Sequence, residues 1–176
     1  MNQIIQRLVE RKSVRAYTGE AIPAADKETI LRAAMEAPTA GNQQLYTILN
    51  ITEQPLRERL AVTCDDQPFI ATADMVLIFC ADCQKWYDAF AAAGCAPRRP
   101  GAGDLLLAAA DAIIAAQNAV VAAESLGVGS CYIGDILEQC ETHRALLHLP
   151  PYVVPVAMLV FGYPTEQQQQ REKLAR

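Results

Sequence analysis

Apolar residues near the N-terminus recur at the three- and four-residue intervals of a helix face. Such a face lies between positions 4 and 9, behind Asn2, whose side chain suits a helix N-cap. Residues 12–20 lack this repeat and are expected to be extended or loop. A second helix is predicted to begin at Pro23 and to end before Pro38, because the residue before a proline disfavours helical geometry.

Three further segments are predicted as strands from their apolar or alternating composition. They cover residues 46–51, 75–80 and 153–161. The segment 75–80 is apolar throughout, which is typical of a strand that is buried on both faces. Short helices are expected over residues 55–62 and 142–147. Another is expected to begin at Asp135, because Glu138 follows it at capping-box spacing.

The longest predicted helix follows Asp104, its expected cap, and runs to Leu126, where Gly127 ends it. It is apolar on nearly every side and rich in alanine. A helix without a polar face is either central to a domain or shared with a second chain, so we expect a large apolar homodimer interface. Asp111 and other polar residues within it favour a buried helix over a membrane span.

Two segments are expected to be irregular. Residues 83–103 hold aromatic residues followed by prolines and glycines, and they form either a mobile lid over a site or simple packing. Residues 127–134 are interpreted as a glycine-rich turn.

Cysteine and histidine residues offer little chemistry. Cys80 and Cys83 have Cys-x-x-Cys spacing, but we expect two buried thiols at a strand end more than a redox pair, because no second such motif exists. His143 and His148 would lie on different faces of a helix, so no metal site is predicted.

Composition narrows the possible functions. The chain has 176 residues and is 52% hydrophobic, which suits one domain with a sizeable core. Its net charge is −5 and it has no long basic run, so nucleic acid is an unexpected partner. Residues 1–20 show no signal peptide, and we expect a cytoplasmic protein with reduced cysteines.

A candidate phosphate site lies close to the N-terminus, where Arg11, Ser13 and Arg15 alternate ahead of Tyr17. In an extended segment such side chains point to the same side, about 6.8 Å apart. Two guanidinium groups and a hydroxyl on one side suit a phosphate. Alternatively, Arg11 and Lys12 complement the C-terminus of the first helix while Arg15 is solvated, and this stretch alone leaves both interpretations open.

Taken in order, five motifs resemble the nitroreductase superfamily of FMN-dependent oxidoreductases across essentially the whole chain. They are the segment 11–17, the turn 38–44, the strand 75–80 with Gln67 and Ile70 before it, the long helix that runs into 127–134, and Gly162-Tyr163-Pro164 with Arg171 beyond. Leu45-Tyr46 departs from the Pro-Trp of many relatives.

The resemblance implies an α+β fold, with a central mixed, mostly antiparallel sheet flanked by helices and a long, buried, alanine-rich helix. It implies that residues 1–176 form a single FMN-binding domain. It further implies an intertwined homodimer with FMN sites at the interface.

Roles for individual residues also follow from the resemblance. Arg11 and Ser13 would bind the FMN phosphate, Arg15 would reach the ribityl or pyrimidine region, and Arg171 would complete the phosphate site. The turn would come from the other subunit, with Asn42 bonding the ring edge, although these residues could equally form an Asx-type turn. The remaining cofactor-binding candidates are Pro38, Thr39, Ala40, Gln67, Tyr132, Ile133 and Gly134.

The chemistry that the resemblance implies is hydride transfer from NADH or NADPH to flavin N5, and then to an oxidised acceptor such as a nitroaromatic or a quinone. The flavin carries this chemistry, so no catalytic side chain is predicted. We favour NADH or dual use, because no dedicated cluster for the 2′-phosphate of NADPH is evident in the sequence, although Arg98 and Arg99 could provide one. The alternatives are a specialised member that performs dehalogenation, enone reduction or flavin breakdown, and a protein that stores FMN without turnover.

Overall fold

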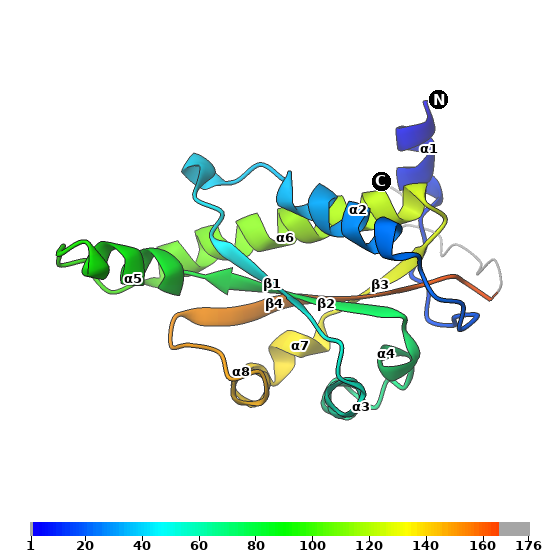
Figure 1. The fold of residues 1–176 in the computed structure, drawn as a ribbon. Helices are drawn as coiled ribbons and strands as arrows, with labels where there is room; N and C mark the ends of the chain where they lie inside the picture. Colours follow the sequence, from blue (N-terminus) through cyan, green and yellow to red (C-terminus); the bar gives the residue numbers. More distant parts are fainter. Residues whose placement is uncertain (1, 166–176) are drawn as a thin grey trace, which may run out of the picture.

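The computed structural model describes residues 2–165 and has a four-stranded sheet at its centre (Figure 1). The strand order is β1-β2-β4-β3, and every neighbouring pair is antiparallel. The strands are β1 (Tyr46–Asn50), β2 (Met75–Asp82), β3 (Gly129–Ile133) and β4 (Val153–Gly162). The one parallel pairing among the described residues is an isolated bridge, so the expected mixed sheet is antiparallel in all its named strands.

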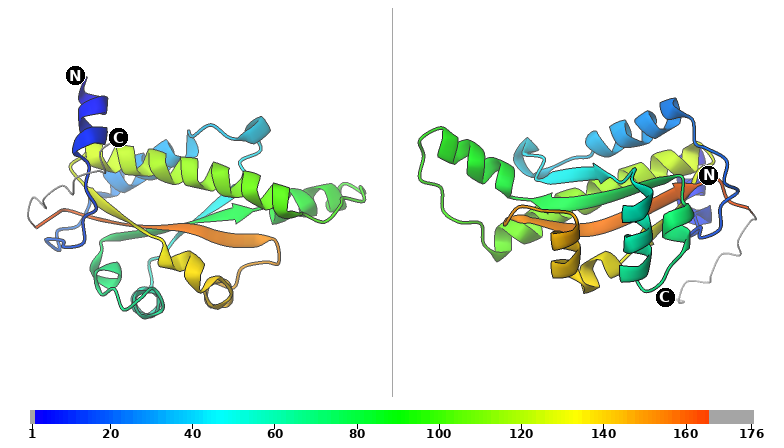
Figure 2. Two further views of the ribbon diagram at one scale, coloured as in Figure 1. Left: turned by 180° about the vertical axis from the view of Figure 1, so that it is seen from behind. Right: turned by 60° about the horizontal axis from the view of Figure 1, so that its bottom comes forward.

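Helices cover both faces of this sheet (Figures 1 and 2). The long helix α6 and α2 lie on one face, and the shorter helices α3, α4, α7 and α8 lie on the other. The helices are α1 (Gln3–Glu10), α2 (Ala24–Met35), the 3-10 turn η1 (Ala40–Asn42), α3 (Gln54–Thr63), α4 (Phe69–Thr72), α5 (Gln84–Ala92), α6 (Ala102–Ser125), α7 (Asp135–Glu138) and α8 (Cys140–Leu146).

Strand β2 divides the core into two layers, because successive side chains of a strand point to opposite faces. Leu77 and Phe79 face the layer under α6, whereas Val76 and Ile78 face the layer under the shorter helices. All of its residues are buried, so the prediction of a strand that is buried on both faces is confirmed.

Helix α6 packs on the sheet through small side chains and leaves larger ones outside. Its buried residues are mostly alanines, which allow the helix to approach the sheet closely. Leu106 and Ile113 are seven residues apart, on one face, and are 72% and 47% exposed. The helix is long and apolar enough to cross a membrane, a test that core helices of soluble domains also pass.

Helix α1 has no buried residue and projects from the body near the C-terminal end of α6 (Figure 1). Its predicted cap is confirmed, because Asn2 Oδ1 accepts a hydrogen bond from Ile5 N at 3.0 Å. Its apolar residues Ile4 and Leu8 are 63% and 49% exposed. The helix therefore presents an apolar face that the body of this chain does not bury.

Two predictions of irregular structure were wrong. Residues 129–133 form the edge strand β3, because β4 supplies a partner that no local pattern reveals. Residues 84–92 form α5, and the signal was available in Trp86 and Phe90, which are one helical turn apart with rings 5.8 Å from each other. The short helix α4 was also not predicted.

Two predicted caps take different positions. Helix α6 begins two residues ahead of Asp104, whose Oδ2 accepts a hydrogen bond from Gly101 N at 2.8 Å. The N-cap of α7 is Gly134, and the carboxylate of Asp135 instead accepts a hydrogen bond from Gln67. The carboxylate of Asp135 therefore holds Gln67 beside the start of α7.

Candidate functional site

The N-terminal segment 11–17 lies along the free edge of β3. Ser13 pairs with Ser130 in a parallel bridge, and Val14 N donates to Ser130 O at 2.9 Å. Further along, Tyr17 bridges Pro164, and its hydroxyl donates to Val14 O at 2.8 Å. The segment is extended, as predicted, and this conformation is what makes its alternating side chains point together.

Two paired glycines make room for this segment. Gly129 of β3 faces Gly162 of β4 in the sheet register. A Cβ atom at Gly129 would lie 2.6 Å from Val14 Cγ2, and one at Gly162 would lie 2.6 Å from Tyr17 Cδ1. Any side chain at these positions would therefore push the segment off the sheet.

We expect Gly162→Ala to destabilise the protein by about 1–3 kcal/mol, because the new methyl group overlaps the Tyr17 ring. If the segment binds the FMN phosphate, as the resemblance implies, its displacement should also weaken FMN binding. Urea unfolding and FMN titration measure the two effects. Gly103→Ala is the control, since its Cβ would meet nothing within 4 Å in the first turn of α6; equal behaviour of the two variants would contradict the packing argument.

Arg11, Ser13 and Arg15 converge beside Cys131. Burial raises the pKa of the Cys131 thiol, while Arg15, a hydrogen bond with Ser13 and the charge of Arg11 act in the opposite direction. All three side chains that the sequence predicts on one side of the segment therefore act on the same thiol. The structure brings the three phosphate candidates together.

Two of the three guanidinium nitrogens of Arg11 lack an acceptor in this arrangement. Its Nε and Nη2 atoms are buried without a hydrogen-bond partner, and so is Ser130 Oγ. Burying such donors is costly unless an acceptor reaches them, which suits a bound anion. The charge of Arg11 also opposes the burial that raises the pKa of Tyr132 to about 12. These residues fit the phosphate end of FMN.

A second group of candidates lies at the other end of β3. Gln67 Nε2 donates to Asp135 Oδ2 at 2.9 Å and to Cys64 O at 2.7 Å, which fixes it beside the start of α7. Gly134 is exposed, and a Cβ there would meet nothing within 4 Å, so its backbone is open to a ligand. Ile133 is 2% exposed and can offer only its backbone.

Tyr132 lies between these two ends of β3 on the face toward α6. Its hydroxyl donates a hydrogen bond to Gln117 Oε1 of that helix at 3.3 Å. The ring is half-buried, so it is held by packing as well as by this bond.

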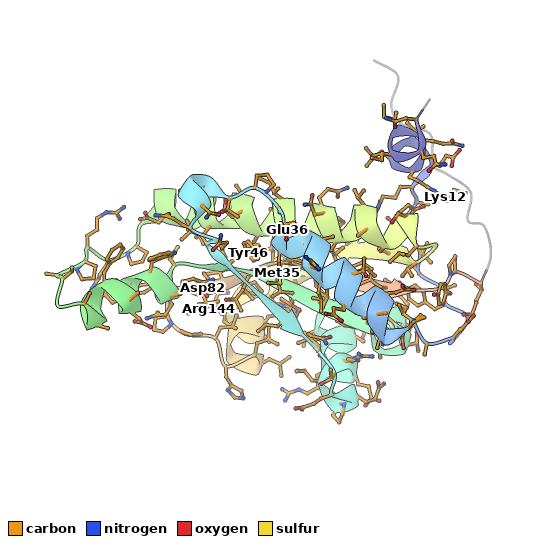
Figure 3. All side chains as sticks on the ribbon, turned by 45° about the horizontal axis from the view of Figure 1, so that its top comes forward. Lys12, Met35, Glu36, Tyr46, Asp82 and Arg144 are labelled. Atoms are coloured by element: carbon orange, nitrogen blue, oxygen red, sulfur yellow. The ribbon has the colours of Figure 1, made fainter. Side chains whose placement is uncertain are left out.

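The turn that begins at Pro38 lies elsewhere in the chain. Ala40 N donates to Asp111 Oδ1 at 3.0 Å, whereas Arg11 acts on Glu124, thirteen residues further along α6. That separation corresponds to about 20 Å of helix. Figure 3 shows the same division, with Lys12 at one end of α6 and Tyr46 toward the other. Within one chain, Pro38, Thr39, Ala40 and Asn42 are therefore not brought to the phosphate candidates.

The last predicted ligand, Arg171, lies outside the described residues.

The lid candidate 83–103 borders a cavity of about 400 Å³. Trp86, Phe90 and Leu107 help to line it, together with Gln43 and Leu45 from the segment after the turn.

Cys80 and His143 are structural in this arrangement. Cys80 is fully buried, and burial raises the pKa of its thiol to about 12, which disfavours the reactive thiolate. His143 is buried and bonded through Nδ1 to Ile136 O at 2.8 Å and through Nε2 to Thr63 Oγ1 at 2.9 Å. Within residues 2–165, no three possible ligands gather around a metal position.

Two residues of interest were missed by the sequence reasoning. Asp111 had a signal, as an acidic residue inside an apolar helix, but it was used only as an argument against a membrane span. Ser130 had none, because its burial beside Ser13 follows from the pairing of a distant segment with β3.

Comparison with known proteins agrees with this fold. The nitroreductase family model matches residues 8–163. An oxygen-insensitive NADPH nitroreductase of Salmonella typhimurium is 34% identical over 175 residues, and an FMN reductase [NAD(P)H] of Bacillus subtilis is 31% identical over 176 residues. Each alignment covers 99% of this chain and 71% of the relative.

Solved structures give the same result. The structure of B. megaterium NfrA2 superposes with a TM-score of 0.94 at 34% identity, covering 99% of this chain and 72% of that one. The family match extends over residues 8–163, and the relatives and the superposition cover 99% of this chain. This chain belongs to the nitroreductase family.

Proposed function

We propose that this protein is an FMN-dependent NAD(P)H oxidoreductase. The observation that carries the proposal is that two guanidinium nitrogens of the half-buried Arg11, Nε and Nη2, are buried without a hydrogen-bond partner, and that Arg11, Ser13 and Arg15 all act on Cys131. The relatives named as an FMN reductase and an NADPH nitroreductase support the same chemistry.

In this proposal each group of residues holds a different part of FMN. Arg11 and Ser13 bind the phosphate with Arg171, and Arg15 reaches the ribityl or pyrimidine region. Gln67, Tyr132, Ile133 and Gly134 line the ring, where an exposed glycine allows close backbone approach. Bound FMN supplies the redox chemistry, accepting a hydride from NADH or NADPH and passing it to a nitroaromatic or quinone in a ping-pong cycle.

The protein is further proposed to be a homodimer with FMN at the interface. Helices α1 and α6 leave apolar side chains exposed, and a second copy of the chain would bury them. Because the turn 38–42 is remote from Arg11 in its own chain, it is proposed to complete the site of the partner. The domain spans residues 1–176 in this proposal, and its location is the cytoplasm.

The protein is proposed to use NADH or both nucleotides, and not NADPH alone. Arg98, which could have recognised the additional phosphate of NADPH, forms a two-bond ion pair with Asp104, at 2.6 and 2.8 Å. Arg98 and the amide of Gly101 lower the pKa of Asp104 to about 2, so this pair stays charged at neutral pH. An occupied Arg98 is less available to a phosphate, which supports NADH or dual use.

An absorbance spectrum of the purified protein tests the function. We expect the bands of oxidised flavin, which should bleach when NADH or NADPH is added without oxygen. Flavin bands that do not bleach would instead identify an FMN-storage protein. A protein that binds no FMN even when FMN is supplied would contradict the proposal.

A further inference from the structure

The segment from Ala40 to Tyr46 has a backbone that local preferences do not explain. Gly41, Asn42 and Gln44 have φ values of 56°, 57° and 45°, in the left-handed region. That region is unfavourable for residues with a Cβ atom, and it persists where surrounding contacts impose it. The contacts that impose it here come from α6 and α5.

Helix α6 holds this segment through Asp111. The Asp111 side chain is 3% exposed, and its Oδ1 and Oδ2 accept hydrogen bonds from Ala40 N at 3.0 Å and Leu45 N at 3.4 Å. No cation pairs with this carboxylate in the part of the chain that the structure describes. Burying a carboxylate is costly unless it is hydrogen-bonded, so its bonds to both ends of the segment are its evident role.

Helix α5 holds the same segment from the other side. Lys85 Nζ donates to Gln44 O at 2.9 Å and to Tyr46 O at 2.6 Å, while Trp86 Nε1 donates to Gln43 O at 2.8 Å. Asp82 fixes the start of α5, because its Oδ1 accepts hydrogen bonds from the backbone amides of Gln84 and Lys85. The two donors are thus mounted on a helix that is itself tied to the end of β2.

We propose that Asp111, Lys85 and Trp86 form a clamp that positions the turn 38–44 against the FMN of the partner subunit. The inference rests on the proposed function. A turn that reaches another subunit has no core of its own, so its side chains keep a fixed position only if its backbone is held. The clamp does this through backbone groups. The side chains of Thr39 and Asn42 accept hydrogen bonds from Gln44 within the turn, at 3.3 and 2.8 Å, so holding the backbone also holds them.

Three substitutions test the clamp: Asp111→Asn, Lys85→Met and Trp86→Phe. Each keeps most of the side-chain volume and removes hydrogen bonds to the segment. We expect Asp111→Asn and Lys85→Met each to raise the dissociation constant of FMN roughly tenfold, as for the loss of one charge-assisted hydrogen bond. Trp86→Phe removes a neutral, exposed hydrogen bond and should raise it by a smaller factor. We also expect shifted flavin absorption bands and a changed reduction potential of bound FMN, which a loss of stability alone would not produce.

Lys27→Met is the matched control. Lys27 pairs with Asp74 at 2.7 Å, as Lys85 pairs with Asp82 at 3.8 Å, but the bonds of Lys27 do not hold the turn. Wild-type values in all three clamp variants would overturn the clamp while leaving the proposed function intact. A wild-type protein that binds no FMN would overturn both. If Asp111→Asn does not fold, the two α5 variants decide the question, since neither residue is buried.

Discussion

Replacing both Arg11 and Ser13 by alanine is expected to give a folded but colourless protein. Arg11 Nε and Nη2 already lack partners within the chain, so the fold loses little when they are removed. FMN loses two phosphate donors, and charge-assisted hydrogen bonds of this kind are each worth about 1.5–3 kcal/mol. We therefore expect the dissociation constant of FMN to rise by roughly a hundredfold or more.

FMN titration followed by fluorescence or absorbance measures this loss, and circular dichroism checks the fold. Arg59→Ala combined with Ser125→Ala is a suitable control, because it removes the same two types of side chain from exposed positions on α3 and α6. Wild-type affinity in the Arg11 and Ser13 variant would refute the phosphate assignment.

Introducing glutamate at Leu106 and Ile113 is expected to give a monomer that also loses FMN. The two side chains lie on the exposed face of α6, where burial against a second chain would be favourable and buried carboxylates would be costly. If the turn 38–42 completes the site of the partner, the monomer lacks the ring contacts from that turn. Sedimentation measures the size, and FMN titration measures the binding.

Val62→Glu is the matched control for this variant, because Val62 is 65% exposed on α3, away from α1 and α6. It should stay dimeric and yellow. A yellow monomer of the Leu106 and Ile113 variant would contradict the shared site, and an unaltered dimer would place the interface elsewhere.

Mixing two defective proteins tests the shared site independently. One carries Arg11→Ala with Ser13→Ala, and the other carries Thr39→Ala with Asn42→Ala. In a mixed dimer, one site then has both defects and the other has none, so random pairing should restore about a quarter of the wild-type sites. No recovery would indicate that the four residues belong to one site within a single chain.

How far the sequence predicts this fold depends on how local each signal is. The run 75–80 and the helix faces are encoded in neighbouring residues, and the structure contains them. Strand β3 was missed because it is short, begins with glycine and serine, and exists by pairing with β4 and with segment 11–17. Helix α5 was not predicted because it is short and is followed by prolines and glycines that are typical of irregular structure.

The candidate site shows the same division. The alternation of Arg11, Ser13 and Arg15 was readable, since an extended conformation needs no distant partner to align its side chains. The burial and the hydrogen-bond partners of these side chains could not be predicted from the sequence. That two nitrogens of Arg11 are buried without a partner depends on how the segment packs over β3, where Gly129 and Gly162 make room for it.

The sequence by itself determined the periodic helices and strands and the family motifs in their order. It also determined that Arg11, Ser13 and Arg15 lie on the same side of an extended segment. Only the tertiary structure decided that the turn lies about 20 Å of helix away from Arg11, and that Asp111, Lys85 and Trp86 hold it. The physical reason is separation along the chain. Periodicity acts over a few residues, whereas Asp111 and Ala40 meet across 71 residues through the packing of α6 on the sheet.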